Sequence, residues 1–155
     1  LTDAQTKVVR EILRDQKSKY SMNRLVQGDV GSGKTIVAII AMFNVIKNGY
    51  QASLMVPTEI LANQHYAETS KILNGFKVEI ELLTGRPSLK EKRRIKERIA
   101  TGEPIIVIGT HALIQEDVDF TNLGLVVTDE QHRFGVEQRN KLINKGRRPD
   151  VLVMT

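Results

Sequence analysis

Cysteine is absent from this sequence of 155 residues, and so is tryptophan. Without cysteine the chain forms neither a disulfide framework nor a thiolate metal site, and it fits a reducing compartment such as the cytoplasm. The four Phe and three Tyr are scattered, so they form no stacking platform for nucleic-acid bases. The longest apolar run covers only residues 36–43, whereas a membrane span needs about 20 residues, and we expect no membrane partner.

The remaining composition is that of an ordinary globular domain. Hydrophobic residues make up 41% of the chain and charged residues 26%, and a length near 150 residues favours one domain over residues 1–155. No signal peptide is visible, and the chain starts without Met and ends abruptly, which indicates a piece of a longer protein. The net charge of +5 permits a polyanionic partner but does not establish one.

Helical and strand patterns alternate along the chain and predict a doubly wound α/β fold. Some segments carry apolar residues at helical spacing, while short continuous apolar runs indicate buried parallel strands. Six or seven strands separated by helices define a mainly parallel sheet with helices on both faces. The predicted helices cover residues 3–17, 34–47, 59–73, 88–100 and 136–145, and the predicted strands cover 24–27, 52–56, 77–83, 105–108, 125–128 and 151–154.

The strongest chemical signal is a glycine-rich loop between a predicted strand and an apolar helix. It follows the pattern G-x-x-x-x-G-K-[ST], in which backbone N–H groups surround phosphates at the start of a helix. Lys34 is expected to contact the β- and γ-phosphates of a nucleoside triphosphate, and the Thr35 hydroxyl to bind Mg²⁺. The residues of this predicted nucleotide site are Gly28, Asp29, Val30, Gly31, Ser32, Gly33, Lys34 and Thr35.

Two adjacent carboxylates end another apolar strand. Asp129 and Glu130 follow residues 125–128, and the carboxyl edge of a parallel sheet is where ligands bind and where the phosphate loop also begins. Asp129 can hold Mg²⁺ through the water shell of the ion. Glu130 can orient or deprotonate the attacking water. The pair therefore completes the prediction of a site that hydrolyses a nucleoside triphosphate.

The three histidines are too far apart in the sequence to indicate a metal site. His65 and His111 are interpreted as ordinary surface imidazoles. His132 follows the acidic pair closely, and its position two residues after Glu130 favours a coupling role in catalysis.

These motifs, in this order, resemble those of superfamily 2 helicases. The sequence Asp-Glu-Gln-His at residues 129–132 is similar to the helicase box of that superfamily, and residues 57–62, 84–85 and 109–111 are similar to three further motifs. Three stretches, GDVGSGKT, GTHALIQ and DEQHRFGVEQR, resemble the bacterial helicases that act on branched DNA. The resemblance covers essentially the whole chain.

The resemblance implies a RecA-like motor lobe that uses ATP and Mg²⁺ and binds DNA. Gln5 falls where such motors read the edge of adenine. Thr58, Thr84, Gly85 and Thr110 fall where such motors contact DNA phosphates without reading bases.

Two basic segments have enough charge to add to a DNA surface. Residues 133–148 hold six positive residues and one negative residue, a net charge of +5, and Arg147 in this segment is predicted to assist DNA binding. Residues 90–98 hold six positive and two negative residues, a net charge of +4, and are interpreted as a solvated helix face.

The resemblance also implies partners beyond these 155 residues. These are a second motor lobe, whose arginines stabilise the transferred phosphoryl group, and a wedge domain that splits branched DNA. The helicase activity, which couples ATP hydrolysis to branch migration and unwinding in recombination and repair, therefore belongs to a parent protein, expected to be a cytoplasmic monomer. The 155 residues alone are expected to be nearly inactive, because an arginine finger is worth about 10³–10⁵ in rate.

Three other readings stay open at this point. The first is another double-stranded DNA translocase, of the transcription–repair coupling or primosomal type. The second is a phosphate-loop kinase or GTPase, although a GTPase needs Asn-Lys-x-Asp and residues 144–147 have Arg where Asp is required. The third is an interaction module that keeps the fold without activity.

Overall fold

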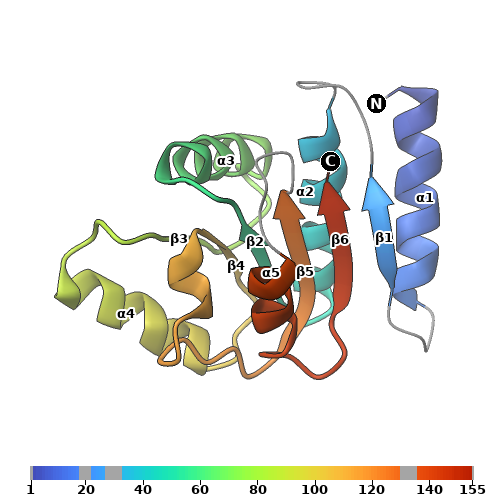
Figure 1. The fold of residues 1–155 in the computed structure, drawn as a ribbon. Coiled ribbons are helices and arrows are strands. Elements are labelled where there is room, and N and C mark those ends of the chain that lie inside the picture. Colours follow the sequence, from blue (N-terminus) through green and yellow to red (C-terminus); the bar gives the residue numbers. More distant parts are fainter. Residues whose placement is uncertain (1, 18–21, 27–32, 130–135, 155) are drawn as a thin grey trace.

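The computed structural model describes residues 2–17, 22–26, 33–129 and 136–154. They form a parallel sheet of six strands in the order β1-β6-β5-β2-β4-β3, with helices on both faces (Figure 1). The predicted doubly wound α/β fold is confirmed. The strands are β1 (Asn23–Val26), β2 (Gln51–Met55), β3 (Ile80–Leu83), β4 (Ile106–Gly109), β5 (Leu123–Asp129) and β6 (Asp150–Met154). The helices are α1 (Asp3–Lys17), α2 (Lys34–Lys47), α3 (Glu59–Ile72), α4 (Leu89–Ala100), the 3-10 helix η1 (His111–Ile114) and α5 (Val136–Ile143).

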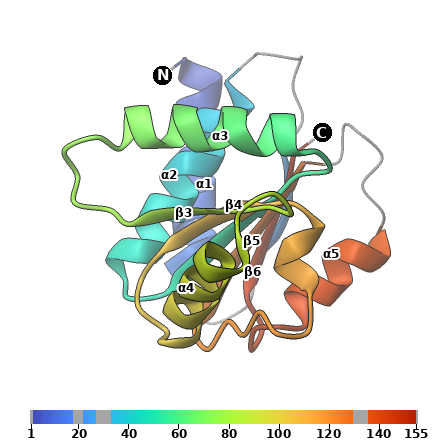
Figure 2. The same ribbon diagram turned by 90° about the vertical axis from the view of Figure 1, so that its left-hand side faces the viewer.

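The alternation of side chains along each strand divides the core between the two faces of the sheet. Leu125 and Val127 of β5 belong to the core beneath α1, α2 and α3, whereas Val126 belongs to the core beneath α4, α5 and η1. Figure 2 shows α1 and α2 on one side of the sheet and α5 on the other. The helix predicted to be apolar nearly all round is α2, and half of its residues are buried. Packing between two layers explains why β4 and residues 125–127 of β5 are apolar without interruption.

The carboxyl ends of all six strands meet at one edge of the sheet, which lies at the top of Figure 1, where α2 also begins. Two pairings fix the register at this edge: Val26 of β1 lies beside Met154, and Met154 lies beside Asp129 of β5. Because neighbouring strands lie about 4.8 Å apart, Asp129 stands about 10 Å from the point where β1 ends. The fold thus brings the acidic strand close to the strand that leads into the glycine-rich loop.

Three local features differ from the sequence-based expectation. The strand predicted over residues 77–83 begins only at Ile80, because Lys77 adopts a left-handed conformation with φ 54° that interrupts the extended chain. The last predicted helix ends at Ile143, two residues early. The turn after β4 forms η1, which no sequence pattern indicated.

Candidate active site

The first turn of α2 has the features of an anion-binding helix start. Gly33 precedes Lys34 in a left-handed conformation with φ 85°, which glycine adopts without strain, and it offers no side chain to cap the helix. The first turn contains no acidic residue. Its N–H groups and the positive end of the helix dipole therefore favour a phosphate. Residues Gly28, Asp29, Val30, Gly31 and Ser32 of the predicted loop lie outside the described residues.

Gln5 lies against this helix start, although the two are far apart in the sequence. Its backbone N–H donates to Thr2 Oγ1 at 3.1 Å, and its Oε1 accepts from the Thr2 N–H at 2.9 Å, which is a capping box at the start of α1. The Gln5 amide nitrogen also fills the space where a side chain on Gly33 would stand. The capping box fixes α1 at the carboxyl edge and places the Gln5 amide next to the predicted nucleotide site.

Asp129 is the last residue of β5 and is largely buried, with 7% of its surface exposed. Its row in the sheet faces α2 and α3, since Leu125 and Val127 belong to that core. The predicted catalytic neighbours Glu130 and His132 lie outside the described residues. Of the predicted catalytic residues Asp129, Glu130 and His132, the structure therefore describes only Asp129.

A magnesium ion fits the donor atoms at this edge. Asp129 and Thr35 supply a carboxylate and a hydroxyl, both hard oxygen ligands of the kind that Mg²⁺ prefers. At nucleotide sites Mg²⁺ takes only one or two carboxylates and completes its shell with water and phosphate oxygens. The described part of the chain holds no group of three or more His, Asp or Glu side chains that could bind a metal ion by themselves.

A second side chain approaches Asp129 from α3. His65 Nε2 lies 3.8 Å from Asp129 Oδ2, and His65 is 9% exposed. The interpretation of His65 as a surface imidazole is wrong, because α3 turns His65 inward together with Ala62 and Thr69. The spacing of these three residues, i, i+3 and i+7, is the signal that identifies the inward face. His111, by contrast, is exposed as expected.

The predicted phosphate-contacting residues follow the carboxyl ends of three neighbouring strands. Thr58 follows β2, Thr84 and Gly85 follow β3, and Thr110 follows β4. Thr58 is exposed and accepts a hydrogen bond from the Leu61 N–H at 3.2 Å, so it is the N-cap of α3. Thr84 and Thr110 are only 4% and 8% exposed, so little of either residue is open to a phosphate.

One exposed cation at this edge was not singled out from the sequence. Arg86 follows Gly85, and its side chain is 88% exposed. Its Nε lies 2.9 Å from Glu59 Oε2, in the first turn of α3. This ion pair joins the loop after β3 to the first turn of α3.

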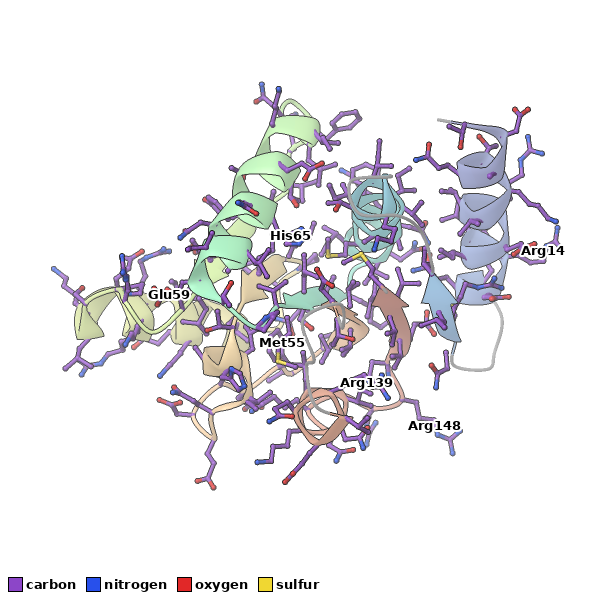
Figure 3. All side chains as sticks on the ribbon, turned by 45° about the horizontal axis from the view of Figure 1, so that its top comes forward. Arg14, Met55, Glu59, His65, Arg139 and Arg148 are labelled. Carbon is purple, nitrogen blue, oxygen red and sulfur yellow. The ribbon has the colours of Figure 1, made fainter. Side chains whose placement is uncertain are left out.

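Arg147, which is predicted to assist DNA binding, does not lie on the surface that carries Thr58 and Gly85. The loop between α5 and β6, which contains Arg147, directly precedes a parallel strand and therefore lies at the amino edge of the sheet. There it lines a hollow with Asn48, Tyr50 and Leu123 at the starts of β2 and β5. Figure 3 shows the neighbouring Arg148 at the side of the molecule away from α3.

The basic segment over residues 90–98 is engaged in ion pairs within the lobe. Arg94 donates to Glu81 at 2.8 and 3.0 Å, and Arg98 Nη1 donates to the same carboxylate at 3.0 Å. Burial, the largest single effect, raises the pKa of Glu81, but these hydrogen bonds and charges outweigh it and lower the pKa overall. The segment is therefore a surface helix held to β3, in line with its interpretation as a helix face.

The comparisons with known proteins agree with this geometry. The sequence matches the DEAD/DEAH box helicase family over residues 2–155, and the chain belongs to that family. Its fold is the RecA-like lobe of these motors, which use ATP. No helix among the described residues has the length and continuous apolar character that a membrane span requires.

Within the family the chain resembles RecG. It is 57% identical over 155 residues to the ATP-dependent DNA helicase RecG of Bacillus subtilis, which covers all of this chain and 23% of that relative. A structure of RecG bound to a three-way DNA junction matches with a TM-score of 0.87 and 51% identity, over 99% of this chain and 20% of that one. The Hef helicase domain of Pyrococcus furiosus shares the fold, with a TM-score of 0.74 at 22% identity over 98% of this chain and 32% of that one. The chain thus spans about a fifth of the length of its RecG relatives.

Proposed function

We propose that residues 1–155 form the first motor lobe of an ATP-dependent helicase that acts on branched DNA. The observation that carries this proposal is the 57% identity to a RecG helicase over the whole chain. The geometry supports it, because the start of α2 and the end of β5 meet at one edge of the sheet. The family match argues against the phosphate-loop kinase and GTPase alternatives.

The residues at this edge divide the chemistry of ATP hydrolysis between them. Lys34 binds the β- and γ-phosphates, and Thr35 and Asp129 hold Mg²⁺. Bound Mg²⁺ neutralises charge on the transferred phosphoryl group. Glu130 orients the attacking water and takes its proton, and His132 couples this step to the rest of the motor. Gln5 reads the adenine edge from its position beside Gly33.

The parent protein supplies the other working parts. A second motor lobe carries the arginines that complete the ATP site, and a wedge domain separates the strands at the branch. Thr58 and Gly85 contact phosphates of the DNA, with Thr84 and Thr110 behind them. The parent acts as a cytoplasmic monomer that drives branch migration and unwinding in recombination and repair.

The test is ATP hydrolysis by the full-length protein on a three-way junction and on a linear duplex of equal length. We expect stronger stimulation by the junction. Lys34→Ala should abolish hydrolysis, and Glu130→Gln should abolish hydrolysis while ATP binding persists, since the amide cannot take a proton. Lys47→Ala, at the other end of the same helix, is the matched control and should leave the rate unchanged.

Two outcomes would contradict the proposal. Unchanged ATP turnover in Lys34→Ala would show that the predicted nucleotide site is assigned wrongly. Equal stimulation by junction and linear duplex would instead identify a translocase of the transcription–repair coupling or primosomal type.

A further inference from the structure

His65 is a polar side chain in a position that otherwise serves packing. It lies on the inward face of α3 between Ala62 and Thr69, both of which are completely buried. Figure 3 shows His65 projecting from α3 toward the interior of the molecule. A hydrophobic residue of similar size would fill this space without a polar atom to satisfy, so packing alone does not explain the imidazole.

The two ring nitrogens of His65 have different surroundings. Nε2 lies 3.8 Å from Asp129 Oδ2, and the two side chains are only 11% and 10% exposed. Nδ1 is buried and has no hydrogen-bond partner among the residues that the structure describes. Leaving a buried polar atom unpaired costs about 1–3 kcal/mol. An Nε2–H tautomer suits these surroundings, because it directs its one proton at the carboxylate and leaves Nδ1 without a proton to satisfy.

We propose that His65 is a positioning residue for Asp129: its Nε2–H donates to Oδ2 and fixes the orientation in which the carboxylate holds the magnesium ion through the water shell of the ion. The 3.8 Å separation exceeds hydrogen-bond length by less than 1 Å. Polar contacts in active sites without ligand are often this long and shorten when the ligand binds. Second-shell hydrogen bonds of this kind orient metal-binding carboxylates. The proposal rests on the proposed function, since it assigns Asp129 to the magnesium of an ATP site.

The helix that carries His65 also reaches the proposed DNA surface. Thr58 caps α3 at the carboxyl edge, and Glu59 in its first turn pairs with the exposed Arg86. His65 follows Glu59 by six residues, a distance of about 9 Å along the helix axis. One helix thus carries both Thr58 at the proposed DNA surface and His65 beside Asp129.

The experiment measures how strongly fluorescent mant-ADP binds to the full-length protein as the Mg²⁺ concentration is varied, with a parallel measurement in EDTA. His65→Leu fills the space but cannot donate. Loss of a hydrogen bond to a metal ligand typically costs about 10–100-fold in metal affinity, so the Mg²⁺ concentration for half-maximal binding should rise about tenfold or more. Binding in EDTA should stay unchanged, because His65 acts only through the magnesium ligand.

Three further variants separate positioning from packing. His65→Gln places an amide N–H near the position of Nε2 and should restore the Mg²⁺ requirement to within about threefold of the unaltered protein. His65→Asn is polar but too short and should behave like His65→Leu. Thr69→Val is the matched control, because Thr69 is another buried polar residue on the same face of α3, and its hydroxyl has no hydrogen-bond partner in the described part of the chain. It should leave the Mg²⁺ requirement unchanged.

An unchanged Mg²⁺ requirement in His65→Leu would overturn the proposal. Equal changes of the Mg²⁺ requirement in His65→Leu and Thr69→Val would also overturn it, and so would weaker binding of mant-ADP to His65→Leu in EDTA. If His65→Leu does not fold, His65→Asn and His65→Gln still decide the question by their contrast. Failure of the proposed function would look different, because the unaltered protein would then not bind mant-ADP at any Mg²⁺ concentration.

Discussion

The side-chain amide of Gln5 occupies the space that a side chain on Gly33 would need, so α1 closes over the start of α2. Gly33 also has φ 85°, a conformation that costs other residues about 1–2 kcal/mol. A Gly33→Ala variant must therefore bear this strain and displace Gln5 from its capping box with Thr2. We expect the free energy of unfolding of the 155-residue chain, measured by urea denaturation, to fall by about 2–3 kcal/mol.

A double-mutant cycle isolates the contact between the two residues. Gln5→Ala alone loses the capping box and should cost about 1 kcal/mol. In the double variant the overlap is gone while the backbone strain remains, so its loss should be smaller than the sum of the two single losses by about 0.5–1 kcal/mol. Strict additivity would show that Gln5 and Gly33 do not touch in solution.

Gly109 allows β3 and β4 to approach each other closely. A side chain there would overlap the backbone carbonyl oxygen of Leu83, which is its partner in the sheet, and would come within 3.0 Å of Leu113. A backbone atom cannot rotate away, so Gly109→Ala should lower the free energy of unfolding by about 3 kcal/mol. Gly85→Ala is the control, because its nearest neighbour is Glu59 Oε1 at 3.7 Å, and it should change stability by less than about 0.5 kcal/mol. Equal effects of the two substitutions would contradict the close approach.

Much of this architecture could be predicted from the sequence, because the apolar patterns repeat with the periods of helices and strands. The bounds of α2 agree with the prediction exactly, and most other bounds agree within one or two residues. The sequence also predicted that Asp129 lies at the same edge as the strand before the glycine-rich loop, since parallel strands end at a common edge. The burial of single polar residues could not be predicted from these patterns. His65, Thr84 and Thr110 are polar, and whether a polar residue faces inward depends on the elements that pack against it.

The placement of Arg147 shows a different kind of error. Its segment precedes a strand that was itself predicted, over residues 151–154. In a parallel sheet the loop before a strand lies at the amino edge, opposite the loops that follow strands. The topology alone therefore separates Arg147 from Thr58 and Gly85, which the net charge of the segment could not indicate.

Glu81 should make the stability of the lobe depend on acidic pH. Hydrogen bonds from Arg94 and Arg98 outweigh the effect of burial and hold the pKa of Glu81 below its ordinary value of 4.5. A lowered pKa in the folded state stabilises the fold above about pH 4.5, and this contribution is lost as the pH falls through the folded-state pKa. Glu81→Gln should therefore cost about 1–2 kcal/mol at pH 7, a loss that shrinks below pH 4.5. Urea denaturation of the two proteins between pH 3 and pH 7 measures the loss of stability at pH 7 and its decrease at acidic pH.

The control for this prediction is Glu91→Gln. Glu91 pairs with the same Arg94, but its side chain is 48% exposed, so solvent weakens the interaction. Its effect at pH 7 should be clearly smaller than that of Glu81→Gln. A loss of stability in Glu81→Gln that stays constant from pH 7 to pH 3 would show that the carboxylate charge of Glu81 is not its source.

The salt dependence of DNA binding should identify the cation that serves the proposed DNA surface. Arg86 is exposed beside Gly85 at the carboxyl edge, whereas Arg147 lies at the amino edge. Each cation that neutralises a duplex phosphate adds about 0.9 to the slope of log affinity against log salt concentration. In fluorescence anisotropy of the full-length protein on duplexes of unrelated sequence, Arg86→Ala should therefore lower the slope by nearly one. Arg147→Ala should leave it unchanged.

Glu59 provides an independent check on the same surface, because it pairs with Arg86 at 2.9 Å. DNA must compete with this carboxylate for the guanidinium group, so Glu59→Gln should strengthen binding at low salt. The gain should disappear when Arg86→Ala is added, since the two changes act through one contact. Thr110→Ala should have little effect on the slope, because a neutral hydroxyl that is mostly buried releases no counterion. A lower slope in Arg147→Ala, together with an unchanged slope in Arg86→Ala, would instead place the bound DNA at the amino edge of the sheet.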